Sequence, residues 1–320
     1  MTQPKTLEAR VIYRSNHSQL AMISIMKQGG IWERLGLDVT RMDLERRALP
    51  AEEQLLNGQC NMIFGCHITP HWRVARGVPM ICMAQTVNTA QDMLVSSKPL
   101  AGVTDLKDRV LAEAEFCDEE GHLTSHVRGT YELYLRDAGL SSEMLEVKPA
   151  EGSEKMQLLL DGKANAMFAS ASQERAAQRL GLHTQLLPRY PMVNSITLTS
   201  LVPLVQENPE LYIRMIKAIA MGIAMVIKDK EKTLEILAGN VAERLGIRDD
   251  IELESFYQRM RTSLEPRLCP KMNSLYNAYR IAELVYPELE EKGNPVKLWD
   301  LHYIRMLEAQ GFFDELYRGS

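Results

Sequence analysis

The sequence predicts an α/β protein with two lobes, and two observations carry this expectation. The chain has 320 residues, which exceeds the usual size of a domain with one hydrophobic core. Segments rich in Val, Ile and Met alternate with longer segments of helical period, a pattern typical of β-α-β units around a mostly parallel sheet. Two α/β units of roughly 100 to 200 residues each are therefore expected.

The first β-α unit has the clearest pattern. Residues 9–13, ARVIY, predict a strand, and residues 20–28 predict a helix that ends at Gly29-Gly30, where glycine favours the left-handed conformation that closes a helix. Further strands are expected at 38–42, at the end of 55–65, at 80–84, at 110–114 and at 165–168. From Pro209 onward the pattern is almost wholly helical, and residues 299–316 predict one closing amphipathic helix.

The two lobes are expected to be discontinuous in sequence. Ser and Pro at 96–99, and Tyr190-Pro191, indicate the two crossings between them. Residues 7–94 and 193–320 would then form lobe 1, with a C-terminal helical extension, and residues 95–192 would form lobe 2.

Charge and cysteine content exclude several classes of protein. The chain has 37 basic and 42 acidic residues without a long run of Lys or Arg, which argues against a nucleic-acid partner. Its five cysteines include no CxxC pair, which argues against a disulfide framework and a thiolate zinc site. The first residues do not have the pattern of a secretory leader. The sequence as given therefore predicts a cytoplasmic protein without a transmembrane segment, or a periplasmic protein if a leader has been removed.

Several short sequence motifs occur in an order that indicates a family resemblance. They are the helix and turn leading to GLDV at 20–39, Leu55-x-Asn57-Gly58-x-x-Asn61-Met62, Ala75-Arg76-Gly77-Val78-Pro79, Leu159-x-Asp161-Gly162-x-x-Asn165-Ala166, and the helix at 204–220. In this order the chain resembles, over about residues 9 to 238, the nitrate, sulfonate and taurine branch of ABC-transporter solute-binding proteins. That branch also contains the pyrimidine-precursor proteins of thiamine biosynthesis.

The resemblance implies a type II periplasmic-binding-protein-like fold with a ligand cleft between two lobes. It also implies a small ligand, anionic or heteroaromatic, and an ABC permease as partner if the chain is exported. Two enzymes share the family's fold, but their motifs do not match here. Gly65 and Thr69 stand where the hydroxymethylpyrimidine synthase has its lysine and histidine, and His17 stands where the hydroxybiphenyl sulfinate desulfinase has its cysteine.

Candidate ligand contacts lie in loops that follow predicted strands, because ligands of open α/β sheets bind at the carboxyl ends of strands and at helix N-termini. Arg14, Arg128 and Arg175 are the cations near these loops. The expected ligand-binding residues are Asn16, His17, Gly65, Cys66, His67, Thr69, Gln85, Asn88, Ser125, His126, Ser170 and Ser172.

Five of the seven histidines fall in these loops, and they are His17, His67, His71, His122 and His126. The pairs 67/71 and 122/126 have the spacing that places two rings on one helical face. His67, His71, His122 and His126 are therefore candidate ligands for Zn, Fe or Mn, although histidines in a polar cleft also hydrogen-bond organic ligands directly. The candidate catalytic residues are His17, Cys66, His67 and His126, where a neighbouring imidazole could activate the Cys66 thiol; a buried, unreactive cysteine is the alternative.

Two classes of function remain open from the sequence. The first is a binding protein for a small metabolite, acting as the receptor of an importer or as a sensor. The second is a cytoplasmic enzyme on the same fold, for instance a metal-assisted decarboxylase or lyase of an aromatic acid. The first class needs no cofactor, and a divalent metal, Zn, Fe or Mn, would serve the metal-assisted form of the second.

Overall fold

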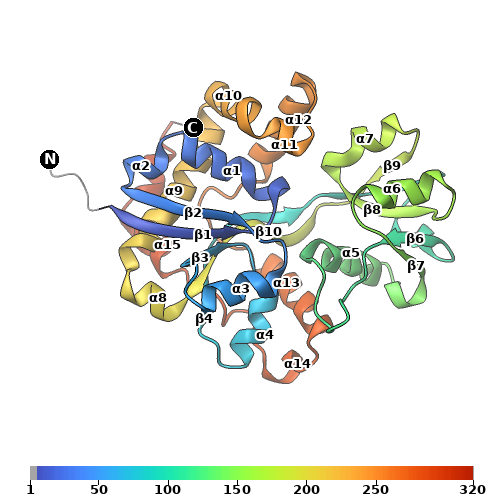
Figure 1. Cartoon of the computed structure of the whole chain (residues 1–320), viewed down its shortest axis with the longest axis horizontal. Helices are drawn as coiled ribbons and strands as arrows, with labels where there is room; N and C mark the ends of the chain where they lie inside the picture. The colour runs from blue at the N-terminus through green and yellow to red at the C-terminus, as the bar shows by residue number, and fades with distance from the viewer. Residues whose placement is uncertain (1–5, 320) are drawn as a thin grey trace. The chain divides into compact units, whose positions relative to one another are not determined.

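The computed structural model describes residues 6–319, and of residues 16–18, 172 and 240 it describes the backbone only (Figure 1). The chain divides into two compact units. Unit 1 contains the described residues up to Asn88, then Val193–Tyr279, and the described residues from Glu288 onward. Unit 2 contains Thr89–Met192 and also Arg280–Pro287, a segment that the sequence pattern assigns to lobe 1.

Unit 1 is built on a five-stranded sheet with the order β2-β1-β3-β10-β4. Strands β1 and β2 pair in parallel, as do β1 and β3, whereas β10 runs antiparallel to β3. The strand bounds are β1 Leu7–Tyr13, β2 Leu37–Leu44, β3 Met62–Phe64, β4 Met80–Ala90 and β10 Tyr190–Leu201. The predicted strands at 9–13 and 38–42 are confirmed within these bounds.

Helices surround this sheet. Their bounds are α1 Asn16–Gln28, α2 Ile31–Arg34, α3 Ala48–Leu56, α4 Thr69–Ala75, α8 Val202–Glu207, α9 Pro209–Lys228, α10 Lys230–Asn240, α11 Ala242–Leu245, α12 Asp250–Ser263, α13 Met272–Val285, α14 Leu289–Lys292, α15 His302–Ala309 and α16 Phe312–Leu316. Helix α13 begins in unit 1 and ends in unit 2. The single closing helix expected over 299–316 is wrong, because Gly311 adopts φ 75 and separates α15 from α16.

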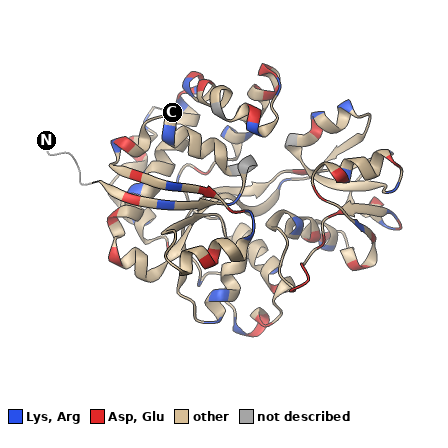
Figure 2. Cartoon of the chain, viewed as in Figure 1, with Lys and Arg blue, Asp and Glu red and all other residues tan. Residues whose placement is uncertain are grey.

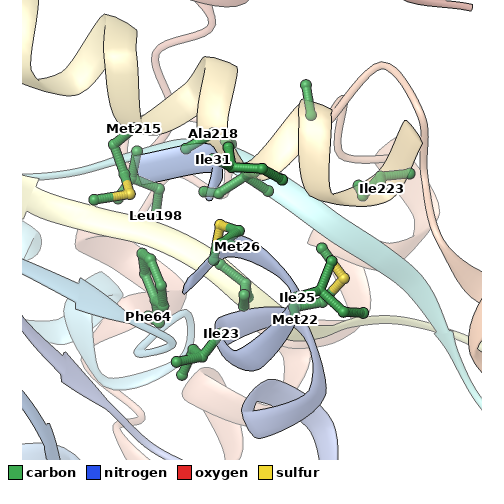
Figure 3. Close-up of a cluster of buried hydrophobic side chains, with 14 of the residues drawn as sticks. Met22, Ile23, Ile25, Met26, Ile31, Phe64, Leu198, Met215, Ala218 and Ile223 are labelled. Atoms are coloured by element: carbon green, nitrogen blue, oxygen red, sulfur yellow. The ribbon is translucent and has the colours of Figure 1, made fainter. Parts of the chain in front are cut away.

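The core of unit 1 lies between α9, α1 and the sheet (Figure 3). Helix α9 passes close to α1 at Gly222, where an added Cβ would lie 3.0 Å from Met22 Cε and 3.1 Å from Met26 Cγ. Met215 and Ile223 of the same helix are fully buried, and each such side chain contributes roughly 1.5–3 kcal/mol by leaving water. Met221 and Met225 of α9 are partly buried and pack against this core.

Unit 2 has its own five-stranded sheet, in the order β7-β6-β8-β5-β9. Strand β6 pairs in parallel with β7 and β8, while β5 pairs antiparallel with β8 and β9. The bounds of strands and α-helices are β5 Asp92–Ser96, β6 Val110–Glu113, β7 Glu146–Pro149, β8 Ala166–Ser170, β9 His183–Leu186, α5 His126–Asp137, α6 Ser153–Leu160 and α7 Glu174–Arg179. Helix α5 begins at an N-cap, where the Ser125 hydroxyl accepts a hydrogen bond from Arg128 N at 3.1 Å.

Basic and acidic residues are interspersed along the helices of both units (Figure 2), and the chain has a formal charge of −5. Among the described helices, none combines the length and the apolar character that a membrane span requires.

Candidate functional site

The candidate site lies at the carboxyl edge of the sheet in unit 1. Strands β1 and β3 are parallel, so Arg14, which follows β1, and Gly65–His67, which follow β3, lie at the same edge. Strand β10 is antiparallel to β3, so its earlier residues reach this edge as well. A hydrogen bond of 2.8 Å from Gly65 N to Thr197 O joins the two strands there.

Two residues at this edge have backbone conformations that are costly for residues with a Cβ. Cys66 has φ 55 and Ser195 has φ 61, and such conformations cost on the order of 1–3 kcal/mol and cluster at functional sites. Gln19 of α1 connects the segment after β1 to β10 at this edge. Its Nε2 donates to Ser195 O at 2.8 Å, and its Oε1 accepts from Arg14 N at 2.7 Å.

His67 belongs to a buried chain of hydrogen bonds that continues through Thr197 and Gln85. Its ring is 5% exposed, and Nδ1 lies 3.0 Å from Thr197 Oγ1. Thr197 Oγ1 in turn donates to Gln85 Oε1 at 2.5 Å, and Gln85 Nε2 donates to Val87 O and Asn194 O, both at 2.6 Å. Strands β4 and β10 therefore fix the position of the His67 ring.

Cys66 does not have the environment of an activated nucleophile. Its Sγ accepts a hydrogen bond from Arg14 Nη1 at 2.8 Å, and this cation favours the thiolate. Burial favours the neutral thiol more strongly, and it raises the pKa of Cys66 to about 12. The prediction of a thiolate activated by a neighbouring imidazole is therefore not supported, and the alternative of a buried, protonated thiol is favoured.

Thr69 forms a hydrogen bond with the buried carboxylate of Glu52 in unit 1. Its hydroxyl donates to Glu52 Oε1, and Arg73 Nε donates to Glu52 Oε2 at 2.5 Å. Glu52 is fully buried, and burial raises its pKa against the opposing effects of Thr69 and Arg73. Thr69, expected to bind ligand, thus stabilises a buried carboxylate that the sequence analysis missed.

Gln85 and Asn88 also have structural partners. Gln85 uses both amide atoms within the chain described above. Asn88 Nδ2 donates to Cys269 O at 2.9 Å, and its Oδ1 accepts from Lys271 N at 2.8 Å. Gln85 thus orients the candidate site through Thr197, whereas Asn88 joins β4 to the segment before α13.

His71 belongs to the core. It is 4% exposed and meets the Tyr279 ring edge-on, with 5.1 Å between centroids. Burial lowers the pKa of His71 to about 3, so the ring is neutral at physiological pH. Among the described residues, none forms a hydrogen bond with its Nε2.

The predicted residues of unit 2 have other surroundings. The Ser125 hydroxyl is occupied as the N-cap of α5, and His126 is the first residue of that helix. His122 Nδ1 lies 3.1 Å from Tyr286 Oη. Ser170 ends β8 opposite Asp92. The side chains of Asn16, His17 and Ser172 lie outside the described residues.

The predicted metal site finds no support in the structure. In the part of the chain whose side chains are described, no three His, Cys, Asp or Glu side chains are grouped so as to bind a metal ion. Three of the four candidate rings have protein partners instead, with His67 on Thr197, His71 against Tyr279 and His122 on Tyr286.

A buried ionic group at the carboxyl edge of the sheet in unit 2 was also missed. Lys155 Nζ lies 2.7 Å from each carboxylate oxygen of Glu113 and donates to Phe168 O at 2.9 Å. Burial, with the repulsion of Glu113 second, raises the pKa of Asp92 to about 7. In the sequence, the one signal for this buried ionic group is the position of Glu113 at the end of an apolar strand.

Unit 2 also has an open depression of about 650 Å³ lined by residues that include Tyr134, Asp137, Leu186 and Tyr190. Asp137 there accepts hydrogen bonds from Tyr190 Oη at 2.5 Å and Arg280 Nη2 at 3.0 Å. None of the predicted site residues is among the described residues that line it. The edge of the sheet in unit 1 remains the stronger candidate, because two strained residues and an oriented histidine meet there.

Comparison with solved structures identifies the fold. The periplasmic sulfonate-binding protein of a putative sulfonate ABC transporter from Methylobacillus flagellatus is 14% identical, with a TM-score of 0.71 and 96% of each chain covered. The periplasmic aliphatic sulphonate-binding protein from Escherichia coli is 15% identical, with a TM-score of 0.69, 97% of this chain and 99% of that chain covered. A Candida albicans gene product described as exhibiting the generic periplasmic binding protein structural fold is 12% identical, with a TM-score of 0.64, 96% of this chain and 95% of that chain covered.

These likenesses show that the chain has the periplasmic-binding-protein fold, which confirms the fold predicted from the resemblance. No model of a protein family matches the sequence. No curated protein matches it either.

Proposed function

We propose that this chain is a small-molecule-binding protein of the solute-binding type, and that its ligand contacts the carboxyl edge of the sheet in unit 1. The observation that carries the proposal is the meeting of Cys66 and Ser195, both with positive φ, with the buried and oriented ring of His67. Backbone strain of this kind persists where function requires a particular geometry.

An unpaired donor at the same edge supports a ligand that offers acceptor oxygens. Arg14 Nη1 and Nη2 donate to Cys66 Sγ and Arg46 O. Its Nε is buried, and no described residue accepts a hydrogen bond from it. A buried donor without a partner costs roughly 1–3 kcal/mol, and a carboxylate, sulfonate or similar polar group of a ligand would remove that cost.

The role and location follow by analogy with the proteins of similar structure. Two of them are named as periplasmic sulfonate-binding proteins, one of a putative sulfonate ABC transporter. By this analogy the chain works in the periplasm rather than the cytoplasm, as the receptor that delivers its ligand to an ABC permease. The alternative, a metal-assisted decarboxylase or lyase, is less favoured, because no group of described side chains could hold its metal ion, although a desulfurization enzyme has a similar structure, at 13% identity and a TM-score of 0.62.

A ligand screen tests the proposal. The protein is heated with each member of a panel of aliphatic sulfonates, taurine, nitrate, aromatic carboxylates and pyrimidines, and its melting temperature is recorded. A ligand at 100 times its Kd stabilises the folded state by about 2.7 kcal/mol, which gives a measurable rise. We expect at least one class to raise the melting temperature of the wild type and of His302→Ala, which alters an exposed position of α15, but not of His67→Ala. The proposal fails if no member of the panel stabilises the wild type, or if His67→Ala responds as the wild type does.

A further inference from the structure

We infer that Gln85 and Thr197 hold neutral His67 in the tautomer that is protonated at Nδ1, so that a ligand group that bonds to Nε2 is a hydrogen-bond donor. The tautomer follows from the hydrogen bonds within unit 1 alone. The consequence for the ligand rests on the proposed function, because it requires the ligand to bind at this edge.

The orientation of the Gln85 amide is the first step. One terminal atom of this side chain lies 2.6 Å from Val87 O and 2.6 Å from Asn194 O. Both neighbours are backbone carbonyls, which only accept hydrogen bonds. The atom between them must be the NH₂ group, and the atom that faces Thr197 must be the carbonyl oxygen Oε1.

The direction of the next hydrogen bond follows. Thr197 Oγ1 and Gln85 Oε1 are 2.5 Å apart, a separation that two oxygens tolerate only when a proton lies between them. Gln85 Oε1 has no proton to give, so the Thr197 hydroxyl donates its single hydrogen to it. Thr197 Oγ1 is left with lone pairs only.

The tautomer of His67 is then determined. Nδ1 lies 3.0 Å from Thr197 Oγ1, and because that oxygen has no further hydrogen to donate, Nδ1 must be the donor. In a neutral imidazole one nitrogen is a donor and the other an acceptor, so Nε2 carries the lone pair. The opposite tautomer would place two lone pairs against each other in a site that is 5% exposed.

Backbone pairing between β3 and β10 holds Thr197 beside the His67 ring. Strands β3 and β10 pair with Phe64 opposite Leu198, and the Thr199 hydroxyl donates to Gly65 O at 2.7 Å. These contacts hold the segment after β3 beside β10, so Thr197 stays within reach of the ring. Gln85 and Thr197 are thus positioning residues, which act on the ligand through His67.

The tautomer selects among ligand chemistries. A hydroxyl, an amide N–H or a heteroaromatic N–H can donate to Nε2 of the neutral ring, whereas an ether oxygen or a fully ionised sulfonate oxygen cannot. A site built to bond one kind of polar group rejects analogues that lack it, because the buried partner is left unpaired. The preferred ligands therefore carry a donor group for His67 in addition to any acceptor group for Arg14.

Nitrogen-15 NMR of histidine-labelled protein without ligand tests the tautomer directly. The chemical shifts of the two ring nitrogens distinguish which one is protonated, and the His67 signals are those that disappear in His67→Gln. With the ring neutral, we expect the wild type and Thr197→Ser to show a proton on Nδ1. Thr197→Val, which lacks the hydroxyl, should show a mixture of tautomers. Thr233→Val, which changes a buried threonine of α10 whose hydroxyl donates to Asp229 O, is the matched control and should leave His67 unchanged.

A wild-type spectrum with the proton on Nε2 of neutral His67 would overturn the inference, even if Thr197→Val did not fold. A Thr197→Val spectrum identical to that of the wild type would remove Thr197 from the role given to it. Because these spectra need no ligand, they can fail while the proposed function stands. The ligand screen can likewise fail while the tautomer is correct.

Discussion

At Cys66, the guanidinium of Arg14 and the burial of the thiol act in opposite directions. Arg14 Nη1 lies 2.8 Å from Sγ and favours the thiolate, yet the pKa of Cys66 rises to about 12 because burial outweighs this cation. His71 shows the same dominance of burial, which lowers its pKa to about 3. Sequence adjacency between Cys66 and His67 could not reveal these effects, since desolvation depends on the surrounding fold.

Asp92 should make the stability of the protein depend on pH. Its pKa is raised from 3.8 to about 7, so between about pH 4 and 7 the folded state binds a proton that the unfolded state has released. The free energy of unfolding therefore falls as the pH rises through this window and is constant above it, a change of up to about 4 kcal/mol. Asp92→Asn should remove this dependence, which urea unfolding at pH 4 and pH 8 would measure.

The control for this experiment is Asp38→Asn, at an exposed position of β2. It should change stability by a similar small amount at both pH values. For Asp92→Asn, the gain over the wild type should be near zero at pH 4 and largest at pH 8. Equal effects of Asp92→Asn at the two pH values would show that the carboxyl of Asp92 titrates normally.

Glu52 should contribute strongly to stability despite being a buried acid. Its carboxylate bonds Thr69 and Arg73, and removal of one partner of a buried ion pair costs about 3–5 kcal/mol. Glu52→Ala should therefore destabilise the protein by at least about 3 kcal/mol in denaturant unfolding. The neighbouring Glu53, whose side chain is 54% exposed, also contacts Arg73 at 2.7 Å, but Glu53→Ala should cost less than about 1 kcal/mol. Similar losses for the two variants would contradict the role given to burial.

For helices and strands, the hydrophobic periodicity of the sequence predicted the positions of elements better than it predicted which side chains interact. The alternation of apolar strands and longer helical segments placed β1, β2 and α1 correctly, because local pattern determines where such elements occur. The closing helix was predicted as one element because its apolar period continues through Gly311, whereas the left-handed φ of that residue divides it. Partners such as Glu52 and Arg73, or Lys155 and Glu113, are distant in sequence, so no local pattern could pair them.

The boundary between the units illustrates another limit of sequence patterns. It falls between Asn88 and Thr89, within β4, and again between Met192 and Val193, within β10. A strand continues across each boundary. The second boundary lies next to Tyr190-Pro191, whereas the first lies before β5, and Ser97 and Pro99 follow that strand inside unit 2.

Two glycines in helices should respond in opposite ways to alanine. A Cβ at Gly129 of α5 would lie 2.5 Å from Ile281 Cγ2 of α13, which is far inside van der Waals contact, so Gly129→Ala should destabilise unit 2 by about 1–3 kcal/mol. At Gly239 of α10 no atom lies within 4 Å of the added Cβ among the described residues, so Gly239→Ala should stabilise by about 0.5–1 kcal/mol. Thermal or urea unfolding of both variants provides the comparison. A stabilising Gly129→Ala would contradict the close packing of α5 on α13.

At the scale of the whole molecule, the fold was predictable and the ligand was not. Structures that are only 14% and 15% identical to this chain match it over at least 96% of its length, because many sequences satisfy the same pattern of buried strands and helices. In the proposed site, ligand recognition depends instead on a few side chains, such as His67 and Arg14, and on the hydrogen bonds that orient them. One fold can therefore carry many binding specificities.

A crystal structure of the protein with the compound that stabilises it most in the screen would locate the ligand directly. We predict density for the compound at the carboxyl edge of the sheet in unit 1, within hydrogen-bond distance of Arg14 Nε or His67 Nε2. Density for it only in the depression of unit 2 lined by Tyr134, Asp137 and Tyr190, with none at residues 65–67, would show that the ligand does not bind at the edge in unit 1.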